Sequence, residues 1–372
     1  MSKRVFISTG EASGEAAAVE LATAMRRLEP GLRFEGIGAA RMAEAGFRVR
    51  WDTRGWASLG PVEAIGKIPK LLAIMLITAA ELRAAPPDLL ILIDFGAFNL
   101  RLARQLRRSG YRGPICYYFP PAAWLDDPQR ARMVAEATIP ITPFAHQREF
   151  YASLGLPAHY FGHPLVSAIG ERPRRSKVAS DGGRVAILPG SRRGELERHA
   201  RLLLESARLL HLRRPRSEFL LGAADDEAAA VLQRLAAEFV ELPAAVVRGA
   251  RAALGDADAA WIASGTAVLE AALLAVPSVA LYIVSRLQER YGRRLVARTG
   301  LRYVTLPNLI LDEPVVPELL QERATQTSLV AALERVLDEP QEQLAAFARV
   351  RAALGPPDAL ERVAAFAVEL TK

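Results

Sequence analysis

The sequence is poor in cysteine, in lysine and in long apolar runs. Its 372 residues include one cysteine, Cys116, so a disulfide framework within the chain is excluded. Cys116 lies in the apolar run Ile115–Phe119, which predicts a buried residue of a strand. A reducing compartment is compatible with this composition.

Long hydrophobic segments are absent as well. From Arg4 the chain runs directly into an apolar strand pattern, which leaves no room for the apolar region of a secretory signal. The longest uncharged run of interest, Leu71–Ala80, is shorter than the roughly 20 apolar residues of a spanning helix. Two interpretations of this run stay open. It is either a helix in a membrane interface, with Lys67 and Lys70 near lipid phosphates, or a helix buried in the core.

Positive charge is carried almost wholly by arginine. The formal net charge of +7 favours anionic partners in general, such as phosphates, nucleic acid or an acidic membrane surface. The sequence has no block of Lys and Arg with interleaved aromatic residues. Nucleic acid is therefore not an expected partner.

Signatures of common cofactors are missing too. Gly36-Ile37-Gly38 lacks the third glycine of a dinucleotide fingerprint. The histidines other than His163 show no ligand spacing with carboxylates or with Cys116, so a zinc site is not expected. Asp256-Ala257-Asp258 has the form of a metal-binding DxD, but it directly precedes an apolar strand, and we favour a turn there. We expect neither a cofactor nor a bound metal.

The length of the chain predicts two domains. Short apolar runs alternate with segments of 3.6-residue periodicity that are rich in Ala, Leu and Arg, such as Leu196–Leu212. This alternation is typical of an α/β fold, in which helices cover parallel sheets. The predicted strands are Arg4–Thr9, Phe34–Ile37, Leu89–Asp94, Ile115–Phe119, Ile139–Thr142, Val185–Leu188, Glu218–Leu221, Ala259–Ala263 and Ser278–Tyr282.

A polar and charged segment, Glu171–Gly183, is the predicted linker. It separates two Rossmann-like domains, residues 1–172 and residues 184–340. The remaining residues, 341–372, have a helical pattern, and we expect these helices to pack back across the domain junction. Ligands of open parallel sheets bind beyond the carboxyl ends of the strands, so we expect a site in a cleft between the domains.

Two turns of small residues predict an anion site in the second domain. Ser264-Gly265-Thr266 follows an apolar strand and opens a helix that contains Glu270. The unpaired N–H groups and the positive end of the helix dipole would face a ligand there. The second turn ends at Arg192, after Gly190 and Ser191, and a guanidinium suits two phosphate oxygens. Two such turns in one domain indicate a diphosphate site.

Polar residues also follow predicted strands of the first domain. Gly10-Glu11-Ala12-Ser13-Gly14 is either a loop that presents Glu11 to a ligand or an ordinary tight turn. Asp94 either caps the next helix or serves as a general base. His163 precedes a proline, which favours an extended backbone, and is either a ligand-binding residue or a structural one.

Amide and carboxylate side chains recur near the end of the second domain. Asn308 follows Leu306-Pro307, and the segment from Val316 contains Glu318 and Gln321. These groups suit hydrogen bonds to a sugar, a ribose or a uracil. Each of them alone is equally typical of a plain loop.

Taken in order, these motifs resemble those of the lipid-A-disaccharide synthase family over about residues 4–323. The matching motifs are GEASG at 10–14, IDxxxFN at 93–99, YYxxPxxW at 117–124, PFx5FY at 143–151, GHPL at 162–165, LPGSRxxE at 188–195, SGTAxLEA at 264–271, LPN at 306–308 and VPELLQ at 316–321.

The resemblance implies a GT-B glycosyltransferase that uses a UDP-sugar. The donor UDP-2,3-diacylglucosamine would pass its sugar, with inversion, to the 6-hydroxyl of 2,3-diacylglucosamine 1-phosphate. Asp94 is our first choice for the base and Glu11 the second, and Arg192 would stabilise the departing UDP. The donor side would comprise Gly190, Ser191, Arg192, Ser264, Gly265, Thr266, Glu270, Asn308, Glu318 and Gln321, and the acceptor side Gly10, Ser13, Gly14, Asn99, Trp124 and His163.

The resemblance also implies a place for the protein in the cell. Both substrates carry acyl chains, so the apolar and basic segment near residues 65–82 would contact the cytoplasmic face of the inner membrane. A homodimer is compatible with the family and is not determined by the sequence.

The sequence departs from the family pattern mainly in the first domain. Glu15 follows GEASG in place of aspartate, and Ala97 replaces the second carboxylate of the IDxPDFN motif. Asp126 and Asp127 stand where the family has an aromatic residue and an arginine, and Ile283 stands where it has another arginine. An aspartate repels a phosphate that an arginine would hold. Two alternatives therefore stay open: a related UDP-sugar enzyme with another acceptor or an epimerase-like reaction, and a catalytically silent paralogue that binds UDP-sugar or lipid.

Overall fold

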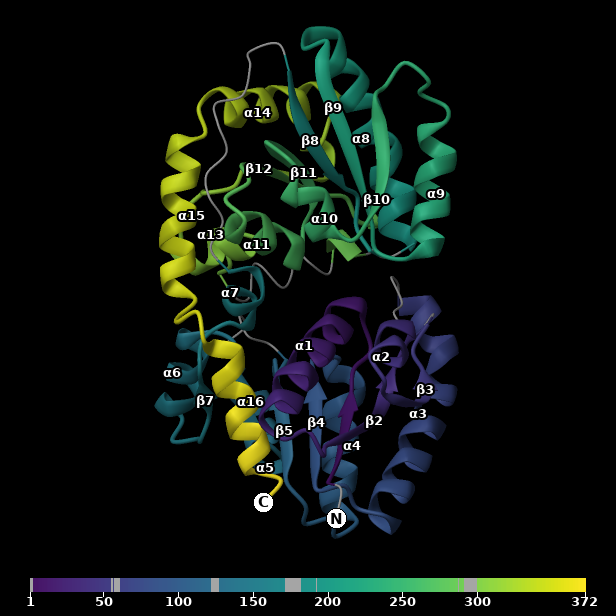
Figure 1. The fold of residues 1–372 in the computed structure, drawn as a ribbon, viewed down its shortest axis with the longest axis vertical. Coiled ribbons are helices and arrows are strands. Elements are labelled where there is room, and N and C mark those ends of the chain that lie inside the picture. The colour runs from purple at the N-terminus through teal and green to yellow at the C-terminus, as the bar shows by residue number, and fades with distance from the viewer. Residues whose placement is uncertain are drawn as a thin grey trace. The chain divides into compact units, whose positions relative to one another are not determined.

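The computed structural model describes residues 3–54, 56, 61–121, 127–170, 182–191, 193–286, 288–290 and 300–372, without the side chains of 12, 61–65 and 67. The chain forms two compact units (Figure 1). Unit 1 comprises residues 1–168 and 354–372, and unit 2 comprises residues 169–353. Most of the predicted linker lies outside the described residues, and its two glycines open the first strand of unit 2.

Unit 1 is built on a parallel sheet of seven strands in the order β3-β2-β1-β4-β5-β6-β7. Its strands are β1 Arg4–Ser8, β2 Arg33–Gly38, β3 Arg48–Asp52, β4 Leu89–Ile93, β5 Ile115–Tyr118, β6 Ile139–Thr142 and β7 His159–Tyr160. Its helices are α1 Ala12–Leu28, α2 Ala40–Glu44, α3 Pro61–Ala84, α4 Gly96–Arg108, α5 Pro128–Ala137, α6 Ala145–Ser153, α7 Pro164–Ile169 and α16 Ala359–Glu369.

Unit 2 repeats this plan with a parallel sheet of six strands in the order β10-β9-β8-β11-β12-β13. Its strands are β8 Gly182–Leu188, β9 Arg216–Ala223, β10 Ala244–Arg248, β11 Ala259–Ala263, β12 Ser278–Tyr282 and β13 Glu318–Leu320. Its helices are α8 Arg193–Arg213, α9 Asp226–Ala236, α10 Ala250–Gly255, α11 Thr266–Leu273, α13 Leu306–Leu311, the 3-10 turn η1 Gln321–Arg323, α14 Gln326–Asp338 and α15 Gln341–Ala353.

Burial on both faces of the sheets explains why the strands could be recognised in the sequence. In unit 1, Ile7 and Ile91 belong to one core cluster, whereas Phe6 and Leu90 belong to another. Strands buried on both faces have continuous apolar runs instead of alternating ones. Every strand predicted from such a run is present, with ends that coincide with the prediction or differ by at most three residues. Cys116 is fully buried in β5, as predicted, and burial raises the pKa of its thiol to about 12.

The strands that apolar runs do not reveal are the edges of the two sheets. These strands are β3 and β7 in unit 1 and β10 and β13 in unit 2. None of their residues is buried, so they lack the continuous apolar pattern of central strands. Short and partly polar edge strands also present a poor template for pairing with another chain.

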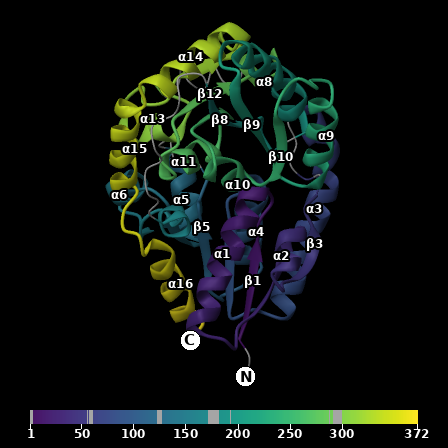
Figure 2. The same cartoon turned by 45° about the horizontal axis from the view of Figure 1, so that its top comes forward.

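The last two helices belong to different units. Helix α15 packs against α11 and α13 in unit 2, where the Gln343 Oε1 accepts a 2.7 Å hydrogen bond from the Ser278 N–H. Helix α16 packs against α1 in unit 1 (Figure 2), and its residues Leu360 and Val363 enter the core of that unit. The chain therefore passes between the units twice, near residue 168 and near residue 354.

The apolar run lies in helix α3, which is partly buried in the core, and its contact with a membrane stays a prediction. One face is buried in the core of unit 1 and includes Ile74 and Met75. Other large apolar side chains of this helix are exposed by nearly half of their surface: Ile68, Leu72, Leu76 and Ile77. No helix among the described residues is long and apolar enough to cross a bilayer.

The glycines of Gly36-Ile37-Gly38 are explained by packing instead of ligand binding. A Cβ at Gly36 would overlap the carbonyl oxygen of Ile7 on the adjacent strand, and a Cβ at Gly38 would overlap the Met42 sulfur. The backbone of a central strand cannot yield in the way that the end of a flexible side chain can.

We expect Gly36→Ala to lower the free energy of unfolding by about 1–3 kcal/mol or more, because the added methyl group forces β1 and β2 apart. Gly66→Ala is the matched control, since no atom lies within 4 Å of a Cβ there and alanine is the better helix former. Urea unfolding curves of the two variants provide the measurement. Equal midpoints would contradict the steric argument.

Candidate functional site

The loops predicted to bind ligands lie where the strand order reverses in each sheet. In unit 1, β1 and β4 are neighbours, so the loop after β1 (residues 9–11) and the loop after β4 (residues 94–95) emerge side by side. In unit 2, β8 and β11 are neighbours and bring the turns at 189–192 and 264–265 together in the same way. Parallel α/β sheets bind their ligands at such switch points.

The backbone of unit 1 is strained at these strand ends. Asp94 and Phe95 both have a φ of 47°, and Phe119, just after β5, has a φ of 58°. Left-handed conformations of residues other than glycine cost about 1–3 kcal/mol each and persist only where the surroundings enforce them. The first of these residues is the candidate base.

Buried neighbours hold the peptide of Asp94 on three sides. Its N–H donates to the Tyr118 carbonyl at 3.2 Å, and its carbonyl accepts from the Tyr117 hydroxyl at 2.9 Å and the Asn99 amide at 3.0 Å. Burial, together with the charge of Asp94, raises the pKa of Tyr117 well above its usual value, so this hydroxyl stays a donor. The residue itself is exposed. The carboxylate therefore belongs to an exposed residue whose backbone is held in place by hydrogen bonds, next to the switch point.

Asn99 has a different place from the one expected for an acceptor ligand. It is fully buried in α4, where its Oδ1 accepts from the Ser8 hydroxyl at 2.7 Å. Its Nδ2 donates to the carbonyls of Ser8 and Ile93 as well as to that of Asp94. The side chain therefore joins the ends of β1 and β4 and supports the Asp94 loop from below.

Packing explains both glycines of the GEASG loop. A Cβ at Gly10 would overlap the ring of Phe95, and a Cβ at Gly14 would overlap the Thr9 hydroxyl. The ring of Phe95 thereby links the loop after β1 to the loop after β4. Glu11 is the N-cap residue of α1 and is partly exposed, and Ser13 is exposed. Glu11 and Asp94 thus lie on two adjoining loops.

Glu15, which replaces an aspartate of the family pattern, is directed into the unit. Its Oε1 accepts a hydrogen bond from the Ala39 N–H at the start of α2. Burial raises its pKa, and the hydrogen bonds from the backbone of Ala39 and Met42 oppose that rise. Glu15 ties α1 to the loop after β2.

The structure describes the segment around Trp124 and Asp127 only in part. Trp124, Asp126 and the residues between them lie outside the described residues. Asp127 is the N-cap of α5, where its Oδ1 accepts from the Arg130 N–H at 3.1 Å. The aspartate that departs from the family pattern therefore has a structural role as a helix cap.

His163 is a buried and neutral histidine. Its Nδ1 accepts from the Leu165 N–H at 3.2 Å, and its ring packs against Phe119 and Phe144 with centroid distances of 5.7 and 5.3 Å. Burial lowers the pKa of His163 to about 3. It offers no positive charge to an anion, and the geometry fits the structural interpretation of this residue.

In unit 2, Glu195 determines the shape of the turn after β8. Gly190 has a φ of 114°, and a Cβ there would lie 2.6 Å from the Cβ of Glu195. The Glu195 Oε2 accepts from the Ser191 N–H at 3.2 Å. That N–H is therefore used within the turn, while the residue itself is exposed; Arg192 lies outside the described residues. The motif LPGSRxxE contained Glu195, but nothing in the sequence alone revealed this contact.

The second turn exposes the N-terminus of α11. Gly265 and Thr266 are exposed, and no side chain caps the helix there. Space around Gly265 is open, since a Cβ there would meet no atom within 4 Å. Glu270, one turn into the helix, accepts a 2.8 Å hydrogen bond from Arg251 of α10. The uncapped N–H groups remain suited to an anion.

Asn308, Glu318 and Gln321 bond to loops of their own unit. Asn308 is buried and exchanges hydrogen bonds with the backbone of Val316. The Glu318 Oε1 accepts from the N–H and the hydroxyl of Thr305, each at 2.8 Å, and from Asn308 at 3.0 Å. The Gln321 Oε1 accepts from the Val284 N–H at 2.8 Å. These loops lack regular structure, so side chains satisfy their backbone groups.

Within the described part of the chain, no three His, Cys, Asp or Glu side chains are arranged to hold a metal ion. In the DxD-like segment, Asp258 forms hydrogen bonds with the backbone of Arg184, near the amino end of β8. Its Oδ2 accepts from the Arg184 N–H at 2.7 Å, and its N–H donates to the Arg184 carbonyl. That segment lies at the beginning of β11, away from the carboxyl ends of the strands.

We expect His163→Asn to flatten the pH dependence of stability. The pKa of His163 is lower in the folded chain than its usual 6.5. Between these values the unfolded chain binds more protons, so stability falls as the pH falls from about 6.5 towards about 3. Asparagine can still accept from the Leu165 N–H but does not titrate.

Urea unfolding at about pH 7.5 and about pH 5 measures the effect. The wild type should lose about 2 kcal/mol more than His163→Asn over this step. A His163→Asn variant as pH-sensitive as the wild type would contradict the assignment.

Comparison with known proteins places this geometry in a family. The family model described as lipid-A-disaccharide synthetase matches residues 5–354. The lipid-A-disaccharide synthase of Geobacter metallireducens is 34% identical over 99% of this chain and 97% of its own length. That of Saccharophagus degradans is 36% identical over 90% of this chain and 88% of its own length.

Solved structures with the same fold are more distant in sequence. A UDP-GlcNAc 2-epimerase from Neisseria meningitidis, bound to UDP-GlcNAc, aligns with a TM-score of 0.64 at 11% identity, over 99% of this chain and 100% of its own. An α,α-trehalose 6-phosphate synthase from Burkholderia multivorans aligns with a TM-score of 0.53 at 14% identity, over 99% and 98%. The chain belongs to the lipid-A-disaccharide synthase family of glycosyltransferases and has the GT-B fold.

Proposed function

We propose that this chain transfers the sugar of UDP-2,3-diacylglucosamine to the 6-hydroxyl of 2,3-diacylglucosamine 1-phosphate, with inversion at the anomeric carbon. The products are a β-1,6-linked disaccharide 1-phosphate and UDP. The observation that carries the proposal is that each unit has candidate groups at its own switch point: carboxylates in unit 1 and turns suited to an anion in unit 2. Membership of the family over nearly the whole length supports it.

The donor would bind to the second domain, residues 184–340. Its diphosphate would lie at the turn around Gly190 and at the uncapped N-terminus of α11, with Arg192 as its counter-charge. Positive groups that are fixed before the reaction stabilise the charge that develops on departing UDP. Asn308, Glu318 and Gln321 would act by fixing the loops beside the donor, since their polar atoms already bond to those loops.

The acceptor would bind to the first domain, residues 1–172, with Asp94 as the base. Asp94 would take the proton of the acceptor hydroxyl while that oxygen bonds to the anomeric carbon. The bond from this carbon to the diphosphate oxygen breaks at the same time, and its electron pair leaves with UDP. Attack from the face opposite the leaving group inverts the configuration. Glu11, on the adjoining loop, is the second candidate for the base.

Incubation with both acylated substrates, followed by mass spectrometry of the lipid products and an assay of UDP, tests the reaction. Formation of the disaccharide 1-phosphate supports the proposal. UDP release without disaccharide would point to another acceptor or an epimerase-like reaction. Binding of UDP-sugar without any turnover would identify a silent paralogue.

We expect Asp94→Asn to lower kcat by about 10²–10⁴-fold, because the amide cannot accept the proton of the hydroxyl. The dissociation constant for UDP should stay within about twofold, since the donor bonds to the other unit in this proposal. Asp358→Asn is the matched control, because this half-exposed carboxylate pairs with Arg362 on α16. A normal kcat and pH profile for Asp94→Asn would exclude Asp94 as the base and direct the test to Glu11.

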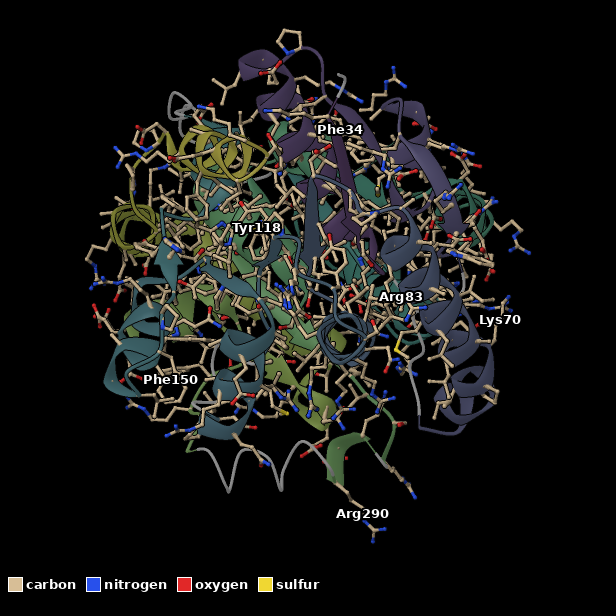
Figure 3. The ribbon with its side chains drawn as sticks, turned by 90° about the horizontal axis from the view of Figure 1, so that it is seen from below. Phe34, Lys70, Arg83, Tyr118, Phe150 and Arg290 are labelled. Carbon is tan, nitrogen blue, oxygen red and sulfur yellow. The ribbon has the colours of Figure 1, made fainter. Side chains whose placement is uncertain are left out.

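We further propose that α3 lies in the cytoplasmic surface of the inner membrane. The exposed apolar stripe of Ile68, Leu72, Leu76 and Ile77 continues over more than two turns of the helix. Exposed cations, Lys70 and Arg83, stand near either end of the stripe and suit the phosphates of lipids. Figure 3 shows Lys70 at the rim of unit 1 and Tyr118 among its interior side chains.

The double variant Leu72→Glu with Leu76→Glu should bind vesicles about tenfold more weakly or worse, because two leucines no longer enter the lipid. Sedimentation with vesicles of phosphatidylglycerol and phosphatidylethanolamine measures the loss. Leu212→Glu is the control, since this leucine of α8 is 75% exposed and lies outside the stripe. Equal binding by the double variant and the control would contradict the role of α3.

A further inference from the structure

His199 joins two loops of unit 2 that the sheet does not connect. It lies on α8, one turn after Glu195, and is fully buried. Its Nδ1 is 2.9 Å from the Pro189 carbonyl oxygen, and its Nε2 is 3.0 Å from the Ile283 nitrogen. The Ile283 carbonyl oxygen also lies 3.2 Å from Nε2. The tautomer with Nδ1–H satisfies the two shorter contacts: Nδ1–H donates to the Pro189 carbonyl, and Nε2 accepts from the Ile283 N–H, while Arg198 donates to the Ile283 carbonyl.

The two contacts of His199 lie on either side of the candidate donor site. Pro189 belongs to the turn after β8, and Ile283 directly follows β12. Strand β11 lies between β8 and β12, and the turn at Ser264 begins at its end. The Ser264 N–H donates to the Leu281 carbonyl at 3.0 Å, so this turn is also fixed to β12. His199 therefore bridges the strands on either side of the anion-binding turn.

The segment Ile283–Val284 is fixed by further side chains. The Arg198 Nε donates to the Ile283 carbonyl at 3.1 Å. Gln321, with a φ of 51°, bonds to the backbone of Val284. The family pattern has an arginine at position 283, and here a guanidinium from α8 reaches the backbone of that position instead.

The bond to Pro189 also fixes the direction of one N–H group. In a planar trans peptide the C=O and the N–H point in opposite directions. Because the Pro189 carbonyl points at the imidazole, the Gly190 N–H points away from it. The Ser191 N–H is occupied by Glu195, so among the described residues of this turn the Gly190 N–H is the one that the contact with His199 orients for an anion.

We propose that His199 is a positioning residue for the diphosphate of the nucleotide, which sets the orientation of the Gly190 peptide and the distance between this turn and the segment after β12. This inference rests on the proposed donor site of unit 2. The charged groups that face His199 are Glu195 and Arg198 of its own helix, and the ring of Tyr282 lies 6.2 Å from its own. Burial lowers the pKa of His199, against the opposing effect of the backbone hydrogen bonds to Pro189 and Ile283, and so favours the neutral form in which Nε2 can accept from the Ile283 N–H.

Substitutions at position 199 test the proposal through UDP binding and kinetics of the full chain. His199→Phe keeps a ring but loses both hydrogen bonds, and it should raise the dissociation constant for UDP and the KM for the donor by about tenfold. The KM for the acceptor should stay within about twofold. His199→Asn keeps an N–H at the Nδ1 position, facing Pro189, and should fall between the wild type and His199→Phe.

Leu203→Ala separates positioning from stability. Leu203 is buried in the core on the same helix and touches neither loop through a polar group, so its loss lowers the melting temperature without changing the UDP dissociation constant. Isothermal titration calorimetry with UDP and thermal unfolding are measured for all variants. If His199→Phe does not fold, His199→Asn carries the test, and its UDP affinity must be below that of Leu203→Ala.

Two results would overturn the inference: an unchanged UDP dissociation constant in the His199 variants, or an equal loss of affinity in Leu203→Ala. A wild-type chain that binds no UDP would overturn the proposed donor site itself. A wild-type chain that binds UDP but forms no disaccharide would overturn only the proposed reaction. The three failures are therefore distinguishable.

Discussion

Backbone groups at the carboxyl ends of the strands need hydrogen-bond partners, and this need organises both halves of the candidate site. Loops that leave a sheet lose its regular pairing, and unpaired buried peptide groups are costly. Asn99 supplies the partners in unit 1, while Glu195, His199, Glu318 and Gln321 supply them in unit 2. The hydrogen bonds of these side chains hold each loop in one conformation. A carboxylate or an N–H group of the loop then has a defined position at the end of the sheet.

The sequence was sufficient for the fold class and for the central strands of each sheet, whereas the location of the site stays a prediction. Central strands are buried on both faces and show as apolar runs, whereas the edge strands β3, β7, β10 and β13 are not buried and leave no such pattern. The roles of single polar residues were harder to predict. An amide such as Asn308 can bond to a sugar or to its own backbone, and only the folded chain shows that the backbone of Val316 uses it.

Departures from the family pattern acquire structural explanations in the same way. Asp127 caps α5, and Glu15 binds the start of α2. At Ile283, Arg198 and His199 reach the backbone from a different helix. A comparison of residue charges with the family pattern suggests that ligand-binding groups were gained or lost at such positions. In this chain the hydrogen bonds at these positions serve a helix cap, a helix start and a loop backbone.

The two passages of the chain between the units have a consequence for biosynthesis. Unit 1 draws part of its core from Leu360, Val363, Ala364 and Ala367, which are translated after the whole of unit 2. Unit 2 is continuous in sequence and draws its core from its own residues alone. The half of the molecule that leaves the ribosome first is thus the half that completes its core last, and α1 presents an uncovered apolar surface until α16 arrives.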